Sequence, residues 1–299
     1  MNDRDTTKTG TPLPRLNVTH RLGAWAGNIV LAALAVGLVG CRSFPITPSG
    51  MMAQSLDGVV TGMRSHPDPE LVRSGAPALL LLIDGLHTDA PENPDLLLTG
   101  TAAYTTYCQA FLTGEDDQPR AALLYERAKN RGLRLLSQQD FFAKALLARQ
   151  DVFEAALQSF RRRDVPGIYW TGAAWLGAIL SQPDSMSALS ELPKALALMK
   201  RVLELDESFQ QGRAHLAMGI YYAVQPPGAG RDLARSRHHF GRAKELAGPT
   251  RLTPLVLLAE FYATSAADPQ LFLETLTTIT ETKLADLPGD DALANAVAQ

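Results

Sequence analysis

Residues 165–180 constrain the fold of this chain more than any other stretch, because nearly all of their side chains are apolar. Pro166 and Gly167 interrupt the structure before them, and Gln182-Pro183-Asp184 marks the other boundary, so the stretch has the length of one helix. Apart from its aromatic residues, Thr171 is its only polar side chain. A helix that is apolar on all sides is buried. We therefore expect a central helix on which other helices pack, or one that forms the wall of an apolar cavity.

Two later stretches are typical of tetratricopeptide repeats. Residues 194–207 place Ala195, Met199 and Val202 where the second helix of such a repeat has a small, a large and a small residue. Residues 214–222 have the pattern of its first helix. The spacing between these repeat-like stretches is irregular, so the repeats are degenerate. The sequence predicts an all-α fold, a degenerate tetratricopeptide-like helical repeat bundle or superhelix of about a dozen helices.

The remaining helices are predicted from apolar spacing at helical period, interrupted by Pro and Gly. Asn93-Pro94 has the form of an N-cap followed by Pro in the first turn. Asp84 is expected to reach solvent from the end of a buried helix. No stretch has the alternation of a β-strand. The expected helices cover residues 77–86, 94–111, 119–136, 140–162, 209–224, 231–246, 252–263 and 269–283, with a short last helix after residues 288–291.

The first 40 residues have the order of a bacterial lipoprotein signal peptide. Lys8 and Arg15 precede an almost wholly apolar core at residues 27–40. This core is shorter than the span of about 20 residues that crosses a membrane, and it has the length of a signal-peptide core. Leu38-Val39-Gly40-Cys41 resembles a lipobox, in which small residues precede an acylated Cys. The alternative is a plain secretory signal in which the Cys is incidental.

The lipobox pattern sets the predicted domains and location. Residues 1–40 are expected to be the signal peptide with its polar N-region, residues 41–50 a lipidated tether and residues 51–299 the helical repeat domain. We predict a palmitate-bearing lipid anchor at Cys41 and a periplasmic location. Since Arg42 comes directly after the Cys, the outer membrane is favoured over the inner one.

Composition and absent motifs argue against several classes of function. The formal net charge is −3 and there is no basic block, so nucleic acid is not an expected partner. Acylation of Cys41 leaves Cys108 without an intramolecular partner, and it is expected to be a small buried side chain. The common nucleotide, hydrolase and zinc-protease motifs are missing, so we expect no enzyme and no cofactor. His238 and His239 are adjacent and point to different helix faces, which is a poor geometry for a metal.

One group of side chains favours a ligand site. His215, Met218, Gly219 and Tyr222 are spaced at i, i+3, i+4 and i+7, so they share a helix face. Packing between repeats is the more common reason for this pattern, because tetratricopeptide repeats place Gly and Tyr in helix contacts. The other interpretation is an apolar channel in which His215 holds the polar end of a ligand. The predicted channel lining comprises Tyr169, Trp170, Trp175, His215, Met218, Gly219 and Tyr222.

Several blocks together resemble one family. They are the lipobox Cys41, residues 77–86, Tyr169-Trp170-Thr171-Gly172-Ala173-Ala174-Trp175, residues 203–207 and residues 214–222. They resemble the TatT family, periplasmic tetratricopeptide-like lipoproteins associated with tripartite ATP-independent periplasmic (TRAP) transporters. The resemblance spans nearly all of the chain after residue 41, and the Tyr-Trp-Thr-Gly-Ala-Ala-Trp block is its most specific part.

The resemblance implies a non-enzymatic accessory protein of a TRAP transporter. It implies a hydrophobic channel in each subunit, a homotrimer, a hydrophobic or amphipathic ligand, and pairing with the transporter's solute-binding protein. The alternative is a lipid-anchored tetratricopeptide-like scaffold for envelope protein assembly, which would bind peptides. The apolar helix at residues 165–180 favours the first alternative, because a peptide-binding groove is expected to be polar.

Overall fold

The described part of the chain is all-α, which confirms the predicted fold class. The computed structural model describes residues 56, 59, 62, 63, 65–228, 230–283 and 292–298, and within these ranges there is no strand. The repeat-like character of the helices stays a prediction. Cys41, the signal peptide and the tether lie outside the described residues.

The helices are joined by short connections. They are α2 (Pro69–Asp89), α3 (Pro94–Phe111), α4 (Gln118–Leu136), α5 (Asp140–Ala145), α6 (Gln150–Leu157), α7 (Val165–Leu180), α8 (Met186–Ser190), α9 (Leu192–Asp206), α10 (Arg213–Val224), α11 (Leu233–Ala247), α12 (Thr253–Leu257), α13 (Pro269–Glu281) and α14 (Ala292–Ala298). Short 3-10 turns are η2 (Glu115–Asp117), η3 (Arg162–Asp164) and η4 (Phe209–Gly212), and α12 continues as the π-helical turn η5 (Leu258–Ala263).

Local sequence explains where several helices begin. Asp68, Asn93 and Asp268 each accept hydrogen bonds from backbone N–H groups of the first turn, and each is followed by Pro. Such a cap satisfies an N–H that has no partner inside the helix, while Pro has no N–H to leave unpaired. The predicted N-cap at Asn93 is therefore confirmed, and α3 ends at Phe111 as predicted.

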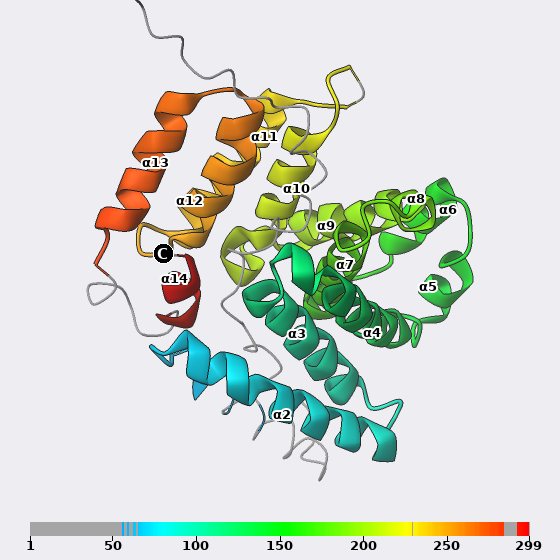
Figure 1. Ribbon diagram of the computed structural model, residues 1–299. Helices are drawn as coiled ribbons and strands as arrows, with labels where there is room; N and C mark the ends of the chain where they lie inside the picture. The colour runs from blue at the N-terminus through cyan, green and yellow to red at the C-terminus, as the bar shows by residue number, and fades with distance from the viewer. Residues whose placement is uncertain are drawn as a thin grey trace, which may run out of the picture.

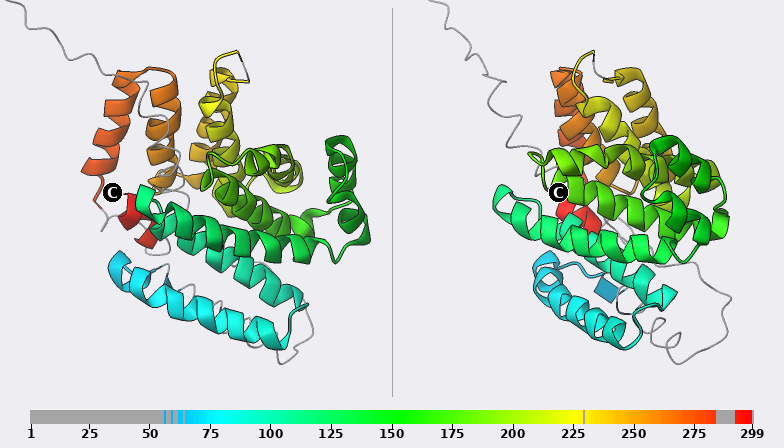
Figure 2. Two further views of the ribbon diagram at one scale, coloured as in Figure 1. Left: turned by 45° about the vertical axis from the view of Figure 1, so that its right-hand side comes forward. Right: turned by 90° about the vertical axis from the view of Figure 1, so that its right-hand side faces the viewer.

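Consecutive helices pack on each other in a curved array (Figure 1). Helices α3, α4 and α7 contact one another, α7 also packs on α9, and α10 packs on α11. The last helix, α14, contacts both α12 and α2, so the C-terminal segment lies against the first long helix (Figure 2). Asn295 joins α14 to the start of α12, because its side chain accepts from the N–H of Leu252 and donates to the C=O of Thr250, both at 3.2 Å.

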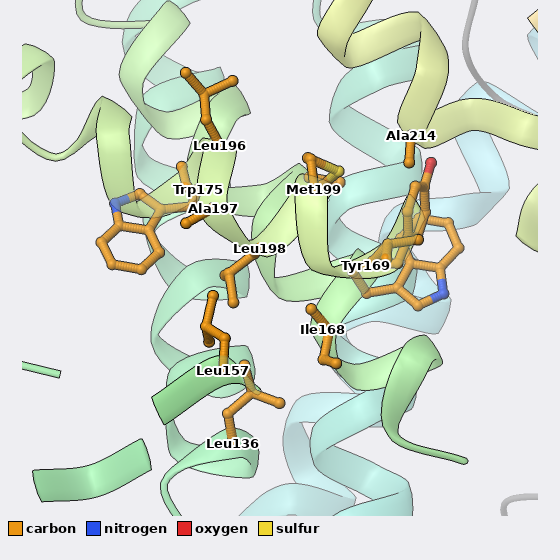
Figure 3. Close-up of a cluster of buried hydrophobic side chains, with 14 of the residues drawn as sticks. Leu136, Leu157, Ile168, Tyr169, Trp175, Leu196, Ala197, Leu198, Met199 and Ala214 are labelled. Carbon is orange, nitrogen blue, oxygen red and sulfur yellow. The ribbon is translucent and has the colours of Figure 1, made fainter. Parts of the chain in front are cut away.

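Helix α7 is the centre of the main core, as predicted. Thirteen of its residues are buried, and Trp170 is among the largest side chains that are fully buried. Tyr169 and Trp175 lie at opposite sides of the core cluster that Figure 3 shows, with Leu198 between them. Each fully buried large apolar side chain contributes about 1.5–3 kcal/mol relative to an exposed one, so this helix is a principal source of stability.

Two predicted helices differ in the structure. Residues 140–162 form α5, α6 and η3 instead of one helix, because Phe142, Phe153 and Phe160 fold together in one aromatic cluster. The first long helix begins at Pro69, eight residues earlier than predicted, and it is not buried on all sides. Leu81 is 69% exposed on its outer face.

Candidate functional site

An apolar cavity of about 120 Å³ lies between α7, α9 and α10. Helix α9 packs against both α7 and α10, and the cavity occupies the space that remains between these two. The lining residues are Gln109, Tyr169, Ala173, Leu176, Gly177, Leu180, Leu192, Leu196, Met199, Arg213, Leu216, Ala217, Ile220, Tyr221, Val224, Gln225 and Leu257.

Each of the three helices presents one face to the cavity. On α10 the lining positions lie at i+3, i+4, i+7, i+8 and i+11 from Arg213, and on α7 they lie at i+4, i+7, i+8 and i+11 from Tyr169. This spacing is that of one stripe along an α-helix. Because Arg213 and Val224 are eleven residues apart, the cavity runs along α10 for about 16 Å at the helical rise per residue.

The two ends of the cavity differ in burial and charge. At one end lie Arg213 and Tyr169, which are 6% and 3% exposed and joined by a side-chain hydrogen bond. At the other end lies Val224, which is 41% exposed. Burial lowers the pKa of the Arg213 guanidinium to about 10; Tyr169 opposes this effect, and nearby Arg251 adds to it. The cavity therefore runs from a buried cationic end to the surface.

Two of the predicted lining residues on α7 lie in the core. Tyr169 lines the cavity, but Trp170 and Trp175 do not. Trp170 is 1% exposed and its ring lies edge-on to Tyr169 at 5.0 Å between centroids. The indole N–H of Trp175 donates to a carboxylate oxygen of Glu191 at 2.6 Å, which ties α7 to the start of α9. Both tryptophans thus pack the elements that hold the cavity in place.

Three of the four predicted residues on α10 contact α11. A β-carbon at Gly219 would meet the ring of Phe240 at 3.0 Å. The ring of Tyr222 stacks on His239 at 5.7 Å between centroids, and Met218 is buried in the core. These residues are outside the lining of the cavity. A ligand role for them and for the two tryptophans stays a prediction.

His215 belongs to a polar cluster on this same α10–α11 face. Its Nδ1 lies 2.8 Å from Nδ1 of His239, and its Nε2 lies 3.3 Å from a carboxylate oxygen of Glu207. Arg242 donates to Glu207 at 2.6 Å. Burial lowers the pKa of His239 to about 4, with the nearby His215 acting in the same direction. Within the described ranges no group of His, Cys, Asp and Glu side chains has the geometry of a metal site.

Sequence reasoning missed Arg213, Leu216, Ile220 and the other cavity-facing residues of α10. The signal that points to them is Arg213, which is the first residue of α10 and the one Arg or Lys in a helix of mostly apolar residues. A charged side chain is almost never fully buried without a specific partner or role. The sequence alone did not show that Arg213 is buried.

The fold and the site define an all-helical protein with an apolar cavity between its central helices and a cation at the buried end. The chain belongs to the TRAP transporter T-component family, whose sequence model matches residues 65–299. This result confirms the resemblance found in the sequence. An uncharacterized protein of Treponema pallidum (strain Nichols) is similar, with 24% identity over 188 residues, which cover 58% of each chain. The chain thus spans less than two thirds of this relative.

Membership gives the protein a coarse role. The family is a component of a transporter and not a family of enzymes, and it associates this chain with a TRAP transporter and the cell envelope. Among the helices of the described residues, none combines the length and the apolar character needed to cross a membrane.

Proposed function

We propose that this protein is a periplasmic, lipid-anchored accessory protein of a TRAP-type transporter that holds a hydrophobic or amphipathic ligand between α7, α9 and α10. The family supports the transporter role. The observation that carries ligand binding is the cavity itself, whose walls are apolar over three helices and which reaches the surface beside Val224.

The energetics of an apolar cavity favour a ligand. Side chains around an empty space lose contacts on one side, and an unfilled cavity destabilises a core in proportion to its volume. Water compensates poorly for this loss, because apolar walls offer it no hydrogen bonds and an apolar ligand that displaces it is favoured. A ligand tail along α10 would restore these contacts, so that ligand binding and stability are linked.

The proposed partners come from the family resemblance. They are the transporter's solute-binding protein and two further copies of this chain in a homotrimer. Co-purification of the two proteins from a membrane extract tests the first, and sedimentation equilibrium of the mature protein tests the second. A mature chain that sediments as a monomer at all concentrations would remove the trimer from the proposal.

The proposed anchor is a lipid on Cys41, because the residues before it have the charged, apolar and small-residue order of a lipoprotein signal. We expect Cys41→Ser to shift the protein from the membrane fraction to the soluble fraction, since a lipid chain supplies about 0.8 kcal/mol per buried CH₂. Mass spectrometry of the wild-type N-terminus gives the independent measurement. An unmodified Cys41, or a chain that begins elsewhere, contradicts the anchor.

The ligand site is tested by filling the cavity. Ala217 lines it and Ala234 is exposed on α11, so Ala217→Phe and Ala234→Phe add the same group in different places. We expect Ala217→Phe to weaken binding of a fluorescent fatty-acid probe at least tenfold, while Ala234→Phe binds as wild type does. Both variants should keep the wild-type far-ultraviolet circular dichroism. Equal binding by both variants would place the probe outside this cavity.

A further inference from the structure

Gln109 of α3 is a buried polar side chain in the lining of the cavity. It is 6% exposed, and its Oε1 is buried without a hydrogen-bond partner among the described residues. The other polar side chains of the lining have different surroundings. Tyr169 and Arg213 are hydrogen-bonded to each other, and Tyr221 and Gln225 are partly exposed. The amide of Gln109 therefore combines burial in the lining with an unused hydrogen-bonding capacity.

An unused amide in this place destabilises the empty protein. A buried amide has left water, and without a new hydrogen bond the loss is not offset. The great majority of buried polar groups in folded proteins are bonded, so an exception calls for a specific explanation. An unbranched apolar side chain such as Met would fill nearly the same space without this loss. A partner that enters the cavity from outside the chain explains why an amide is present.

The amide meets the cavity away from its buried cationic end. Burial raises the pKa of Tyr125 and Cys108 acts in the same direction, so Cys108 lies close to the ring that packs at Gly177. Gln109 directly follows Cys108, and Gly177 lines the cavity eight residues after Tyr169. Eight residues correspond to about 12 Å along a helix. The ligand group that meets Gln109 is thus well separated from the group that lies at Tyr169.

The chemistry of an amide indicates which ligand group fits. The side chain of Gln has one acceptor oxygen and two N–H donors, and its last torsion is soft, so that either end of the amide can turn towards a ligand. A hydroxyl both donates and accepts, and it therefore fits either orientation. A charged group would lose its hydration among the apolar walls, and a single neutral amide does not offset that loss.

We propose that Gln109 is a specificity-determining residue that binds an uncharged hydroxyl on an otherwise apolar ligand chain. This inference rests on the proposed function, because it assigns one further group of a ligand in the same cavity. It makes the cavity selective for hydroxylated chains over plain ones. The remaining lining of α7, α9 and α10 near Gln109 is apolar, so the hydroxyl has one position along the ligand at which it is favoured.

The test compares the position of one hydroxyl on a constant chain. Displacement of a fluorescent fatty-acid probe from the mature protein is measured for dodecanoate and for hydroxydodecanoates with the hydroxyl near the carboxylate, in the middle of the chain or at its far end. The proteins are wild type, Gln109→Met and Thr106→Val. Thr106 is the matched control, because its Oγ1 on the same helix is also buried without a partner among the described residues but lies outside the cavity lining.

We expect wild type and Thr106→Val to bind one hydroxydodecanoate about tenfold more tightly than dodecanoate, the factor that one hydrogen bond supplies. In Gln109→Met this preference should disappear, while dodecanoate binds at least as tightly as before. Thermal melting without ligand gives an independent measurement. Gln109→Met should melt at a higher temperature than wild type, because it removes a buried amide that has no partner.

A wild type that binds no hydroxydodecanoate more tightly than dodecanoate would overturn the assignment and leave the apolar ligand site intact. A preference that persists in Gln109→Met, or a lower melting temperature of this variant, would also overturn it. If Gln109→Met does not fold, Gln109→Leu removes the same amide and decides. Failure of wild type to bind the probe and every dodecanoate would contradict the proposed ligand site as well.

Discussion

Gly177 lies where α7 crosses α4, and its missing side chain lets the two helices approach. A β-carbon at this position would overlap the ring of Tyr125, which is buried. Gly241 on α11 is a natural comparison, because no atom lies within 4 Å of the place where its β-carbon would be. The two glycines thus separate the effect of packing from the effect of helix propensity.

We expect Gly177→Ala to destabilise the protein by about 1–3 kcal/mol, since overpacking forces side chains and backbone to shift. Gly241→Ala should stabilise it by about 0.5–1 kcal/mol, because Ala restricts the unfolded chain and favours the helix. Urea unfolding of both variants at neutral pH gives the two free energies. A Gly177→Ala variant as stable as Gly241→Ala would mean that α4 and α7 do not pack as closely as described.

Asp84 shows what sequence reasoning misses at the scale of single residues. The sequence predicts that it reaches solvent at a helix end, but α2 continues to Asp89, and Asp84 accepts hydrogen bonds from Tyr104 at 2.7 Å, Arg127 at 2.6 Å and Arg131. Burial opposes its ionisation, but the bonds from Tyr104 and Arg131 outweigh burial and lower its pKa. Its partners are 20–47 residues away in sequence, so no local pattern reveals them.

At the scale of the helix, two faces of α10 have different surroundings. One face lines the cavity, and the other holds His215 against His239 of α11. Because Nε2 of His215 faces the Glu207 carboxylate, it is the nitrogen that donates there. One proton then lies between the two Nδ1 atoms. When both rings are protonated, each Nδ1 carries a hydrogen and neither can accept, so the hydrogen bond between the rings is lost.

This pair predicts a loss of stability in acid. Burial lowers the pKa of both rings, of His239 to about 4. Between pH 4 and the ordinary value of about 6.5 the unfolded chain therefore binds more protons than the folded one, and stability falls as the pH falls through this window. Because His239 is only partly buried, screening by solvent reduces the effect to about 1 kcal/mol.

The measurement is urea unfolding at pH 7.5 and pH 5 for wild type and His239→Gln. We expect the variant to lose less stability than wild type on acidification, because it has one group fewer to protonate. The contributions of other titrating groups to this loss cancel when the two proteins are compared. One such group is Glu260, whose pKa is raised by burial to about 7. An equal loss in the two proteins would show that the histidine pair does not titrate with unfolding.

The faces of α10 also show where sequence reasoning ends. The helix is apolar nearly all round, so periodicity finds it but does not say which face meets a cavity. The sequence pattern favours the face with His215, Gly219 and Tyr222, which contact α11. The cavity lies on the face that begins at Arg213. By contrast, α3 and α7 have clear start and stop residues, and their predicted bounds agree with the structure.

At the scale of the whole molecule, the helices do not form an open row. Helix α14 contacts α2, and Val297 packs against the cluster that includes Val72 and Tyr107. The sequence predicts a last short helix but not where it packs, since contacts between the two ends of a chain have no local signal. Helices α7, α9 and α10 lie in the middle of the array (Figure 1).

The central claim is that the apolar cavity between α7, α9 and α10 holds a hydrophobic or amphipathic ligand. A crystal structure of the mature protein grown with ω-bromododecanoate tests it most directly, because the bromine marks the tail by its anomalous signal. We predict a bromine peak inside this cavity, among the apolar side chains of α7, α9 and α10. A ligand bound elsewhere, with this cavity empty, would contradict the claim.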